Sequence, residues 1–509
     1  MKEIDGLNFV KLDILGLDNI EIINETCKLA NIKRLVPGNI IDDEKVWKDI
    51  RDNTTFIFQW ESDNAQNYLK QLLSDETVEK IKENNKDFKY IDLMSVGNGA
   101  IRPAGASYRN ELAKGLYRDN GHKSLNEMLA PTLGYLVYQE QIIEFLNKFC
   151  GFTMGEADIV RRGFAKKTGT EQFIPRIKDG FIKTMKEEYN VAEEESEKLV
   201  INFLKVIEDA SSYLFSLNHS LPYSYIGYAC GYLRYYYTLE FITCSLNNVM
   251  YKNTDNASDK TSKIIKYGLD RGIKFEEFKF GKSKAEYSCE KETNSIFKGL
   301  KSIKFLNDDV AEELYELSKE FNGDFVDLLK EIVETTSCNS RQLKILISLN
   351  FFSDYGKRRY LMNIYELFSK RYKKTLKEET KQKRLAEIKG KIKEYKDEDF
   401  TIKEIIASQK EFLGYITYTD SKIKPSIGVI TDIDGAYSTK WINIYYLKTG
   451  VIKQYKAKKQ IIDELELKEN DIVNIKETEM KPKTIKTDDG WKQDWDNMQE
   501  HIVKINKVR

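Results

Sequence analysis

The hydrophobic period of this 509-residue chain changes along its length, and the change limits the folds open to it. From about residue 19 to 250 the apolar residues recur at helical spacing, as Ile142, Leu146 and Phe149 do. Between residues 426 and 475 the pattern becomes short β-rich runs separated by turn residues. The sequence therefore predicts a mostly helical chain with a small β-barrel towards its C-terminal end.

The remaining stretches predict smaller elements. Residues 8–16 have the composition of a buried strand, and residues 251–262 (YKNTDNASDKTS) have that of a polar linker. Residues 263–300 are expected to be mixed α/β. Helical spacing returns over residues 308–395.

Composition excludes several classes of protein. Hydrophobic residues make up 41% of the chain, as in folded proteins, and no apolar run approaches the roughly 20 residues of a membrane span. The first residues, MKEIDGLNFVKLD, contain early acids and no long apolar core, so a secretory signal is not expected. None of the six cysteines forms a CxxC pair, which favours reduced cytosolic cysteines over a zinc ribbon or a disulfide framework.

Charge is balanced overall but uneven along the chain. The 81 Lys and Arg residues match 81 Asp and Glu residues, whereas a DNA-binding protein is often basic. Between Lys357 and Lys396, however, 15 Lys or Arg residues stand against 5 Glu residues. Such a stretch suits contact with a phosphate backbone, and it equally suits a solvated helical face.

The strand FVKLDILGL, residues 9–17, combines an apolar face with two charged residues. Alternate residues of a strand share a face, so Lys11 and Asp13 lie side by side, opposite the apolar side chains. An acid and a base in this arrangement suit a metal or phosphate site. Two charged residues on the surface of an edge strand give the same pattern.

A cationic strip is expected on the helix GEADIVRRGFAKK. Arg162 and Lys166 lie four residues apart and share a face, with Arg161 and Lys167 beside them. The strip could hold a triphosphate, because arginine makes bidentate contacts with phosphate. Asp158, three and four residues before the arginines, could instead simply pair with them.

The segment YLFSLNHSLPYSYIGYACGYLRYYY, residues 213–237, is rich in aromatic residues. It contains His219, one of only three histidines, and Arg234. Aromatic residues interleaved with arginine suit stacking on nucleic-acid bases. They suit the core of a helical domain equally well.

Together these segments resemble one family, the C-family replicative DNA polymerases represented by the alpha subunit of bacterial DNA polymerase III. Residues 9–17 look like the palm strand that carries the family's third catalytic aspartate. The other matches occur in the family's order: Phe58-Gln59 with Glu61-Ser62 for FQxES, Arg102-Pro103 for the RPGP turn, Tyr138-Gln139-Glu140-Gln141 for YQEQ, GEADIVRR with Lys166-Lys167 for GEADxxRRAMGKK, and Tyr213, Phe215 and His219 for YGFNKSHAAAY.

Beyond residue 250 the resemblance concerns the family's later domains. Residues 297–303 (FKGLKSI) resemble the start of a helix-hairpin-helix region, although the glycine expected next is missing in IKFLND. Residues 341–359 resemble a later part of that region. Glu411 with Leu413-Gly414 resembles the segment before the family's oligonucleotide-binding barrel.

The resemblance implies a domain order and a set of site residues. The domains would be a palm remnant (1–20), a large helical fingers domain (21–250), a linker and mixed α/β region (251–300), a helix-hairpin-helix region that binds duplex DNA (301–400), a connector (401–423) and an oligonucleotide-binding type of β-barrel (424–509). Asp13 would be catalytic and a metal ligand, with Lys11 as a catalytic phosphate contact nearby. The nucleotide would meet Arg161, Arg162, Lys166, Lys167, His219 and Tyr213, and DNA would meet Arg102, Arg358, Arg359, Lys440, Tyr445 and Lys448.

The sequence departs from the family's pattern in two ways. The PHP domain, the thumb and the first palm strands are not found among these residues, and nothing before Asp13 supplies the palm's other two aspartates. Leu217 stands where the family has a lysine, and Ser216 where it has an asparagine. One cation near the incoming nucleotide is thereby lost.

The resemblance implies template-directed nucleotidyl transfer with two Mg²⁺ ions, in which the protein mainly positions groups and balances charge. One carboxylate does not hold two Mg²⁺ ions, so we expect the chain to be inactive alone. It would act on primer-template DNA and dNTP with an N-terminal polymerase chain that carries the PHP domain, the thumb and the rest of the palm. A natural split polymerase and a fragment of a longer one look alike at this level.

The expected location is the cytoplasm of a bacterium, or of the host if a phage encodes the chain, with no membrane partner. A sliding clamp is a further candidate partner, although no peptide of the QxxLF type is evident. The alternative function is a non-catalytic DNA-binding accessory protein derived from polymerase fingers. Retention of Lys11, Asp13 and the Arg161-Arg162 pair argues against it, and a helix-hairpin-helix repair factor does not explain YQEQ or GEADxxRR.

Overall fold

The computed structural model describes residues 16–85, 87–166, 169–210, 214–252, 257–435, 438–487 and 490–508. The chain divides into two compact units, Met1–Phe241 and Ile242–Arg509. The strand predicted over residues 8–16 lies outside the described residues except for Gly16.

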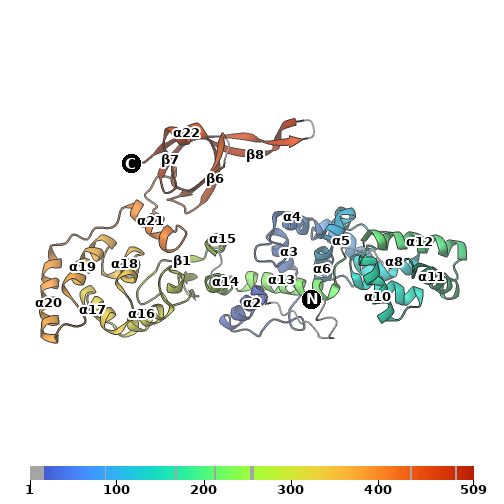
Figure 1. Ribbon diagram of the computed structural model, residues 1–509, viewed down its shortest axis with the longest axis horizontal. Coiled ribbons are helices and arrows are strands. Elements are labelled where there is room, and N and C mark those ends of the chain that lie inside the picture. The colour runs from blue at the N-terminus through green and yellow to red at the C-terminus, as the bar shows by residue number, and fades with distance from the viewer. Residues whose placement is uncertain are drawn as a thin grey trace. The chain divides into compact units, whose positions relative to one another are not determined.

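The first unit is built from helices, as the sequence predicts, and Figure 1 shows them in blue to green. Its α-helices are α2 (Asp18–Leu29), α3 (Glu44–Asp52), α4 (Asp63–Leu72), α5 (Asp75–Asn84), α6 (Tyr90–Ala100), α7 (Arg109–Leu112), α8 (Lys123–Leu129), α9 (Gln139–Cys150), α10 (Met154–Lys166), α11 (Ile174–Tyr189), α12 (Glu193–Ala210) and α13 (Leu217–Tyr236).

Local sequence signals set several helix boundaries in this unit. The hydroxyl groups of Ser62 and Ser74 accept hydrogen bonds from the first turns of α4 and α5. Gly151 ends α9 and Asn190 ends α11 in the left-handed conformation, with φ of 69° and 55°. The ends of these helices could therefore be predicted from the nearby sequence, whereas tertiary packing determines which helix faces contact each other.

Two contacts organise the interior of the first unit. Helices α9, α11 and α12 bury a cluster of aromatic rings that includes Phe145, Phe149, Phe181 and Phe203, each at most 2% exposed. The turn after α6 needs a glycine, because a Cβ atom on Gly105 would lie 1.8 Å from the Ala100 carbonyl oxygen. The glycine of the RPAG sequence thus allows a close backbone approach.

The second unit begins with helices where a linker was expected. Helix α14 (Thr238–Lys252) ends in the polar segment 251–262, and α15 (Ala257–Leu269) begins in it. The prediction of a linker is therefore wrong for the described residues of this segment. Burial of Ile264 and Ile265 explains the difference, because tertiary packing outweighs a polar composition.

A small mixed sheet follows, as predicted for residues 263–300. Strand β3 (Ser295–Phe297) pairs in parallel with β1 (Lys274–Glu276) and antiparallel with β2 (Ser288–Glu290). The next helices share one hydrophobic core: α16 (Asp308–Glu320), α17 (Phe325–Thr335), α18 (Ser340–Ser348), α19 (Arg358–Arg371) and α20 (Glu378–Lys391). Helix α21 (Ile402–Phe412) leads to the last domain.

The last domain is a closed five-stranded barrel with the strand order β4-β5-β6-β8-β7 (Figure 1). Its elements are β4 (Ile427–Asp434), β5 (Thr439–Tyr446), β6 (Ile452–Lys458), α22 (Lys459–Glu464), β7 (Ile472–Thr487) and β8 (Gly490–Lys507). A helix between the third and fourth strands of such a barrel fits the predicted oligonucleotide-binding type. The sequence pattern located β4 to β6 but not the long β7–β8 ribbon, whose charged residues mask its alternation.

Two further findings concern the whole of the described chain. No helix among the described residues is long and apolar enough to cross a membrane. Five of the six cysteines are buried, and Cys289 is partly exposed.

Candidate functional site

Four of the predicted site residues, Lys11, Asp13, Lys167 and Tyr213, lie outside the described residues. Within the described ranges, no group of three or more His, Cys, Asp or Glu side chains is placed to hold a metal ion. The assignment of Mg²⁺ to Asp13 therefore rests on the resemblance alone.

The YQEQ motif begins α9, and its outer two residues anchor the start of that helix. The Tyr138 hydroxyl lies 2.9 Å from the Ser95 hydroxyl on α6. The side-chain oxygen of Gln141 accepts hydrogen bonds from the backbone N–H groups of Val137 and Tyr138, both at 2.9 Å. Its amide nitrogen donates to the Thr132 hydroxyl at 2.7 Å. Burial of these groups makes each bond necessary, since an unpaired buried polar group is costly.

The inner two residues of the motif hold the start of α13. The Gln139 side chain donates to the Leu214 carbonyl oxygen at 2.9 Å. The Glu140 carboxylate accepts from the Ser216 hydroxyl at 2.7 Å and from the Leu217 backbone N–H at 2.9 Å. A carboxylate at the N-terminus of a helix is stabilising, because it pairs with free N–H groups and with the positive end of the helix dipole. YQEQ is therefore a structural joint between α9 and the 214–217 segment.

The cations of α10 are only partly committed to internal pairs. Arg161 donates to Asp158 at 2.8 Å and to the Gln139 side-chain oxygen at 2.9 Å, and its side chain is 16% exposed. Arg162 pairs with the other Asp158 oxygen at 2.7 Å, but its side chain is 66% exposed. Lys166 is exposed. The pairing of both arginines with Asp158, one of the two possibilities that the sequence left, is thus present. It still leaves the exposed side chains of Arg162 and Lys166 accessible to a ligand.

Asp158 is held ionised by this arrangement. Partial burial works against the charged form, but hydrogen bonds and charges from Arg161 and Arg162 outweigh it and lower the pKa of Asp158 below its usual value. The carboxylate therefore stays charged near neutral pH and orients both guanidinium groups.

A row of aromatic and cationic side chains runs beside the same segment. The Arg102 guanidinium lies over the Phe215 ring at 4.2 Å. The Phe215 ring is 6.5 Å from that of His219, which is 6.2 Å from that of Tyr223. Tyr223 in turn meets Phe58, from the FQxES sequence, at 5.1 Å. Arg102 and His219 are exposed, so the row presents charged and aromatic groups to solvent.

Both groups of side chains converge on residues 214–219. The backbone of Phe215 bonds to Gln139 and Val137 at 2.9 and 3.2 Å, so it lies beside the start of α9. Gln139 in turn contacts Arg161. The structure therefore brings Arg102, Arg161 and His219 together through shared neighbours, with Arg162 and Lys166 on the same helix as Arg161. Gln139 and Phe215 were not among the predicted site residues, although both lie in matched motifs.

The rest of the aromatic segment is mostly core. The Arg234 side chain is fully buried, donates to the Thr55 carbonyl oxygen at 2.6 Å and pairs with Asp49. Tyr228 is 2% exposed and stacks on Trp47. Of the two possibilities that the sequence left open for this segment, a helical core describes these residues, and stacking on bases remains open only near His219.

The predicted DNA contacts of α19 are engaged within the second unit. Arg358 has a side chain 12% exposed and donates to Asp399 at 2.8 Å. Arg359 pairs with Glu404 and lies 4.5 Å over the Phe400 ring. With the Thr401 groups, Arg359 lowers the pKa of Glu404 to about 2. Neither arginine is free to meet a phosphate without breaking an internal contact.

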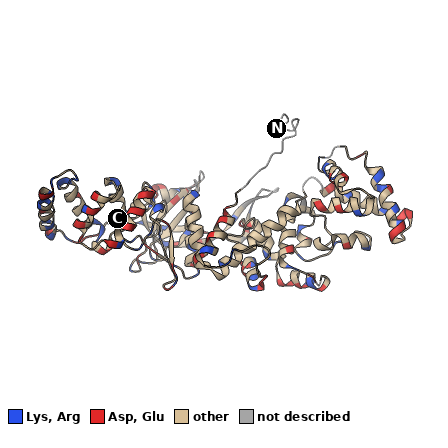
Figure 2. Ribbon diagram, turned by 90° about the horizontal axis from the view of Figure 1, so that it is seen from below, with Lys and Arg blue, Asp and Glu red and all other residues tan. Residues whose placement is uncertain are grey.

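Other cations of the basic stretch are available. Figure 2 shows blue predominating on helix α20, at the left edge of the view. The side chains of several exposed lysines make no ion pair or hydrogen bond with any described residue, namely Lys370, Lys373, Lys377, Lys391, Lys393 and Lys396. Lys383 is also exposed, and its charge acts on Glu387. Adjacent lysines can attract a phosphate backbone without fixed geometry.

Phe305 occupies the place of the glycine expected in the first hairpin of the helix-hairpin-helix region. Its φ is 69°, which is unusual for a bulky residue. The Gln342 side-chain amide donates a hydrogen bond to the Phe305 carbonyl oxygen at 3.2 Å, and the Arg341 guanidinium lies 3.9 Å from the centre of the Phe305 ring. The helix that follows starts with Asp308 and Asp309, which oppose an anion. This hairpin is therefore poorly suited to bind a DNA phosphate.

The barrel offers a different face from the one predicted. Tyr445 is 4% exposed, because it packs in a cluster with Ile406 of α21 and Ile416 of the connector, so its predicted contact with DNA does not fit its position. Lys440 is half-buried on β5 and Lys448 is exposed in the turn after it. Trp441, which the sequence reading missed, is partly exposed on β5.

Trp441 lies under a cation from the neighbouring strand. The Lys456 ammonium of β6 sits 4.7 Å from the Trp441 ring, and the two residues are register partners. Strands two and three of an oligonucleotide-binding barrel form its ligand face, and here these strands are β5 and β6. The alternation of Trp441 with the inward-facing Ile442 was the signal in the sequence.

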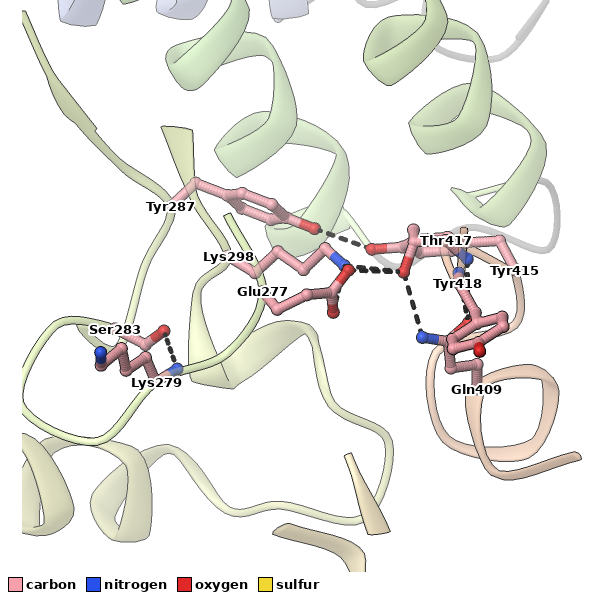
Figure 3. Close-up of polar contacts among 9 residues, drawn as sticks. All are labelled: Glu277, Lys279, Ser283, Tyr287, Lys298, Gln409, Tyr415, Thr417 and Tyr418. Atoms are coloured by element: carbon pink, nitrogen blue, oxygen red, sulfur yellow. Dashed lines mark hydrogen bonds and ion pairs between the residues drawn. The ribbon is translucent and has the colours of Figure 1, made fainter. Parts of the chain in front are cut away.

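An ion pair between the buried Lys298 and the half-exposed Glu277 fastens the barrel connector to the mixed sheet, as Figure 3 shows. The Lys298 ammonium donates to both Glu277 oxygens, at 2.9 and 3.0 Å, and to the Thr417 hydroxyl at 2.9 Å. The Gln409 side-chain oxygen accepts from the backbone N–H groups of Thr417 and Tyr418. Lys298 belongs to the FKGLKSI sequence and is 1% exposed, so it is structural.

Comparison with known proteins finds sequence similarity to one family of polymerase subunits. The model of the bacterial DNA polymerase III alpha subunit finger domain matches residues 106–189, and that of a helix-hairpin-helix motif matches residues 272–362. Three DNA polymerase III alpha subunits illustrate the similarity: that of Ureaplasma parvum is 26% identical over 73% of this chain and 37% of its own length, that of Campylobacter jejuni 27% over 81% and 34%, and that of Bacillus subtilis 27% over 70% and 30%.

These matches cover most of the chain, which spans about a third of the length of the curated relatives. The finger match contains YQEQ and both arginines of α10, and the helix-hairpin-helix match contains Lys298 and Phe305. The chain therefore contains a region similar to the finger domain of the bacterial DNA polymerase III alpha subunit and a helix-hairpin-helix motif, and these findings support its similarity to a C-terminal part of that subunit.

Proposed function

We propose that this chain supplies the nucleotide-binding fingers and the DNA-binding regions of a replicative DNA polymerase. The observation that carries the proposal is the gathering of Arg102, Arg161 and His219 around the 214–219 segment, with Arg162 and Lys166 exposed beside them. Cations suit the triphosphate of a dNTP, and a row of aromatic rings suits its base. Leu217 contributes no charge, so Arg162 and Lys166 carry more of the binding.

The polymerase reaction needs carboxylates besides Asp13. When bound, two Mg²⁺ ions would activate the primer hydroxyl and neutralise the leaving pyrophosphate. Asp13 would take part in holding them, together with carboxylates of a polypeptide region that carries the PHP domain, the thumb and the rest of the palm. The residues of the fingers would hold the triphosphate in line with the primer and exclude alternative orientations.

We expect that the purified chain does not extend a primer with Mg²⁺ and four dNTPs, and that a mixture with a polypeptide carrying the rest of the palm does. Asp13→Asn should abolish extension without dissociating the complex. The nearby control Glu3→Gln should leave extension unchanged. Arg162→Ala should raise the dNTP concentration needed by about tenfold or more, because a charge-assisted hydrogen bond is lost. Arg176→Ala is the matched control, since Arg176 is half-exposed and pairs with Glu156.

Extension that persists in the Asp13→Asn mixture would remove Asp13 from the reaction. A complex that binds DNA but never extends a primer would instead favour the non-catalytic accessory protein.

Binding of DNA by the chain should weaken as salt rises. The log of the binding constant should fall by about 0.7 to 0.9 per phosphate contact for each tenfold rise in salt. Changing Lys383, Lys391 and Lys393 together to Gln should reduce the slope by about 2 to 3, measured by fluorescence anisotropy at several salt concentrations.

The matched control changes Lys80, Lys123 and Lys198 to Gln, which alters net charge equally but removes lysines paired within their own helices. Equal slopes for the two triple variants would show that net charge, not the basic stretch, governs binding.

A further inference from the structure

The basic stretch of the second unit ends at an acidic segment, residues 397–404. The segment carries Asp397, Glu398, Asp399 and Glu404, and it follows directly after the exposed Lys396. Figure 1 shows this part of the chain as the coil that leads from α20 to α21. The segment therefore places negative charge next to a stretch that is otherwise suited to a phosphate backbone.

The acidic segment is bound to the N-terminal end of α19. The Lys357 backbone N–H donates to the Asp397 carboxylate at 2.8 Å, and the Lys357 ammonium donates to the Asp397 carbonyl oxygen at 3.3 Å. The Tyr360 backbone N–H donates to the Glu398 carbonyl oxygen at 3.1 Å. The first N–H groups of a helix have no partner within the helix, so oxygen atoms of the segment satisfy two donors of this turn.

The segment also holds the two arginines of the same turn. Arg358 donates to the Asp399 carboxylate at 2.8 Å, and Arg359 pairs with Glu404 and lies over the Phe400 ring. The Nε atom of Arg358 is buried and has no hydrogen-bond partner among the described residues. Asp399 therefore satisfies this guanidinium with one hydrogen bond, whereas a phosphate can accept two in parallel.

These contacts can be exchanged for contacts with another anion. The side chains of Asp399 and Glu404 are 39% and 42% exposed, so water and salt screen their attraction to the arginines. A phosphate that replaced them would form charge-assisted hydrogen bonds of the same kind with the same guanidinium groups. Displacement of the segment by a polyanion therefore exchanges one set of ion pairs for another and leaves no arginine unpaired.

We propose that the acidic segment is an autoinhibitory contact, which occupies Arg358 and Arg359 in the free chain and is displaced by the phosphate backbone of duplex DNA. The released arginines then add to the exposed lysines that precede the segment, Lys393 and Lys396. The inference rests on the proposed function in that it assumes a chain that binds DNA. It adds that part of the cationic surface is masked by this chain's own carboxylates, so that removing acidic residues strengthens binding through two particular arginines.

The test measures binding of the full chain to a short labelled DNA duplex by fluorescence anisotropy at several salt concentrations. The triple variant Asp397→Asn, Asp399→Asn and Glu404→Gln keeps the shape of the segment and removes its charge at these positions. It should bind the duplex about three- to tenfold more tightly than the unchanged chain. The log of its binding constant should also fall more steeply with salt, by about 1 to 2, because Arg358 and Arg359 become free to meet phosphates.

The matched control changes Glu366, Glu379 and Glu394 to Gln. These residues lie on α19, on α20 and just after α20, and their side chains are exposed and form no ion pair with any described residue. The control changes net charge by the same amount but leaves the arginines masked, so its gain in binding should be much smaller. Equal gains for the two triple variants would overturn the inference, because net charge alone would then account for them.

Substitution of the arginines in both backgrounds identifies the groups that are masked. Arg358→Gln with Arg359→Gln should remove the gain of the triple variant. In the unchanged chain the same pair should weaken binding less, because the lost phosphate contacts are offset by the loss of internal pairs that DNA has to break. A loss of the same size in both backgrounds would overturn the inference.

Hydrogen exchange in the unchanged chain gives a measurement that needs no substitution. Addition of the duplex should speed amide exchange in residues 397–404, because the segment leaves α19, while the rest of α19 keeps its protection. Exchange in the segment that is unchanged or slower while the duplex is bound would overturn the inference. A chain that binds no DNA in any of these forms would contradict the proposed function itself.

Discussion

Replacing Arg234 with alanine is expected to lower the free energy of unfolding of the first unit by about 3–5 kcal/mol. The Arg234 side chain is fully buried, and its guanidinium donates to Asp49 and to the Thr55 carbonyl oxygen. Removing it takes a charged partner from Asp49 and the guanidinium donor from the Thr55 carbonyl group. Arg234→Lys should recover little, since one ammonium does not reproduce the planar fork.

Chemical denaturation followed by the fluorescence of the buried Trp47 and Trp60 measures this effect. Arg162→Ala is the control, because the side chain is 66% exposed and its helical pair should be worth about 0.3–0.5 kcal/mol. A loss below about 1 kcal/mol for Arg234→Ala would show that the interior adapts to the missing guanidinium.

Replacing Lys298 with alanine is expected to destabilise the second unit by about 2–3 kcal/mol and to release the barrel connector. The expected loss is below that of a fully buried pair, because the Glu277 side chain is 48% exposed. Limited proteolysis should then cut within residues 414–425, where the unchanged chain resists. Lys319→Ala is the control, since Lys319 is half-exposed and its ion pair with Glu316 and its contact with the Tyr315 ring both lie within its own helix.

The same variant has a defined pH dependence. Partial burial of Glu277 opposes its ionisation, but the charge and hydrogen bond of Lys298 outweigh it, so the pKa of Glu277 lies below its usual value. A lowered pKa in the folded state stabilises the fold above the unfolded pKa of about 4.3, and the gain is lost as pH falls through the folded pKa. The difference in melting temperature between the unchanged chain and Lys298→Ala should therefore be largest near neutral pH and shrink below about pH 4. A constant difference would contradict the role of the carboxylate.

Much of the fold could be predicted because periodicity is local. The helical spacing of Ile142, Leu146 and Phe149 indicated α9 correctly, and the alternation around Ile442 and Ile444 indicated the barrel. Helix α15 was missed because its polar sequence gives no sign of the core that Ile264 and Ile265 join.

The site could be predicted less completely, because spacing does not say what covers a face. The outer face of β5 carries both Trp441 and Tyr445. The connector, which is distant in the sequence, packs over Tyr445 and buries it, whereas Trp441 stays partly exposed beside Lys456. For the same reason the sequence could not separate Arg162 from Arg358: each pairs with an aspartate, but the Arg162 side chain is 66% exposed and the Arg358 side chain only 12%. The left-handed backbone of Phe305 is set by contacts with Gln342 and Arg341, from another helix.

The joint formed by YQEQ has a consequence for reading mutational scans of such polymerases. Tyr138, Gln139, Glu140 and Gln141 direct their side chains to other parts of the protein and so hold Arg161 and the start of α13. In a screen scored only by DNA synthesis, substitutions at all four positions would be indistinguishable from losses of reacting groups. A parallel measurement of protein abundance or folding would separate the two, and would assign this motif to the framework that aims the cations rather than to the chemistry.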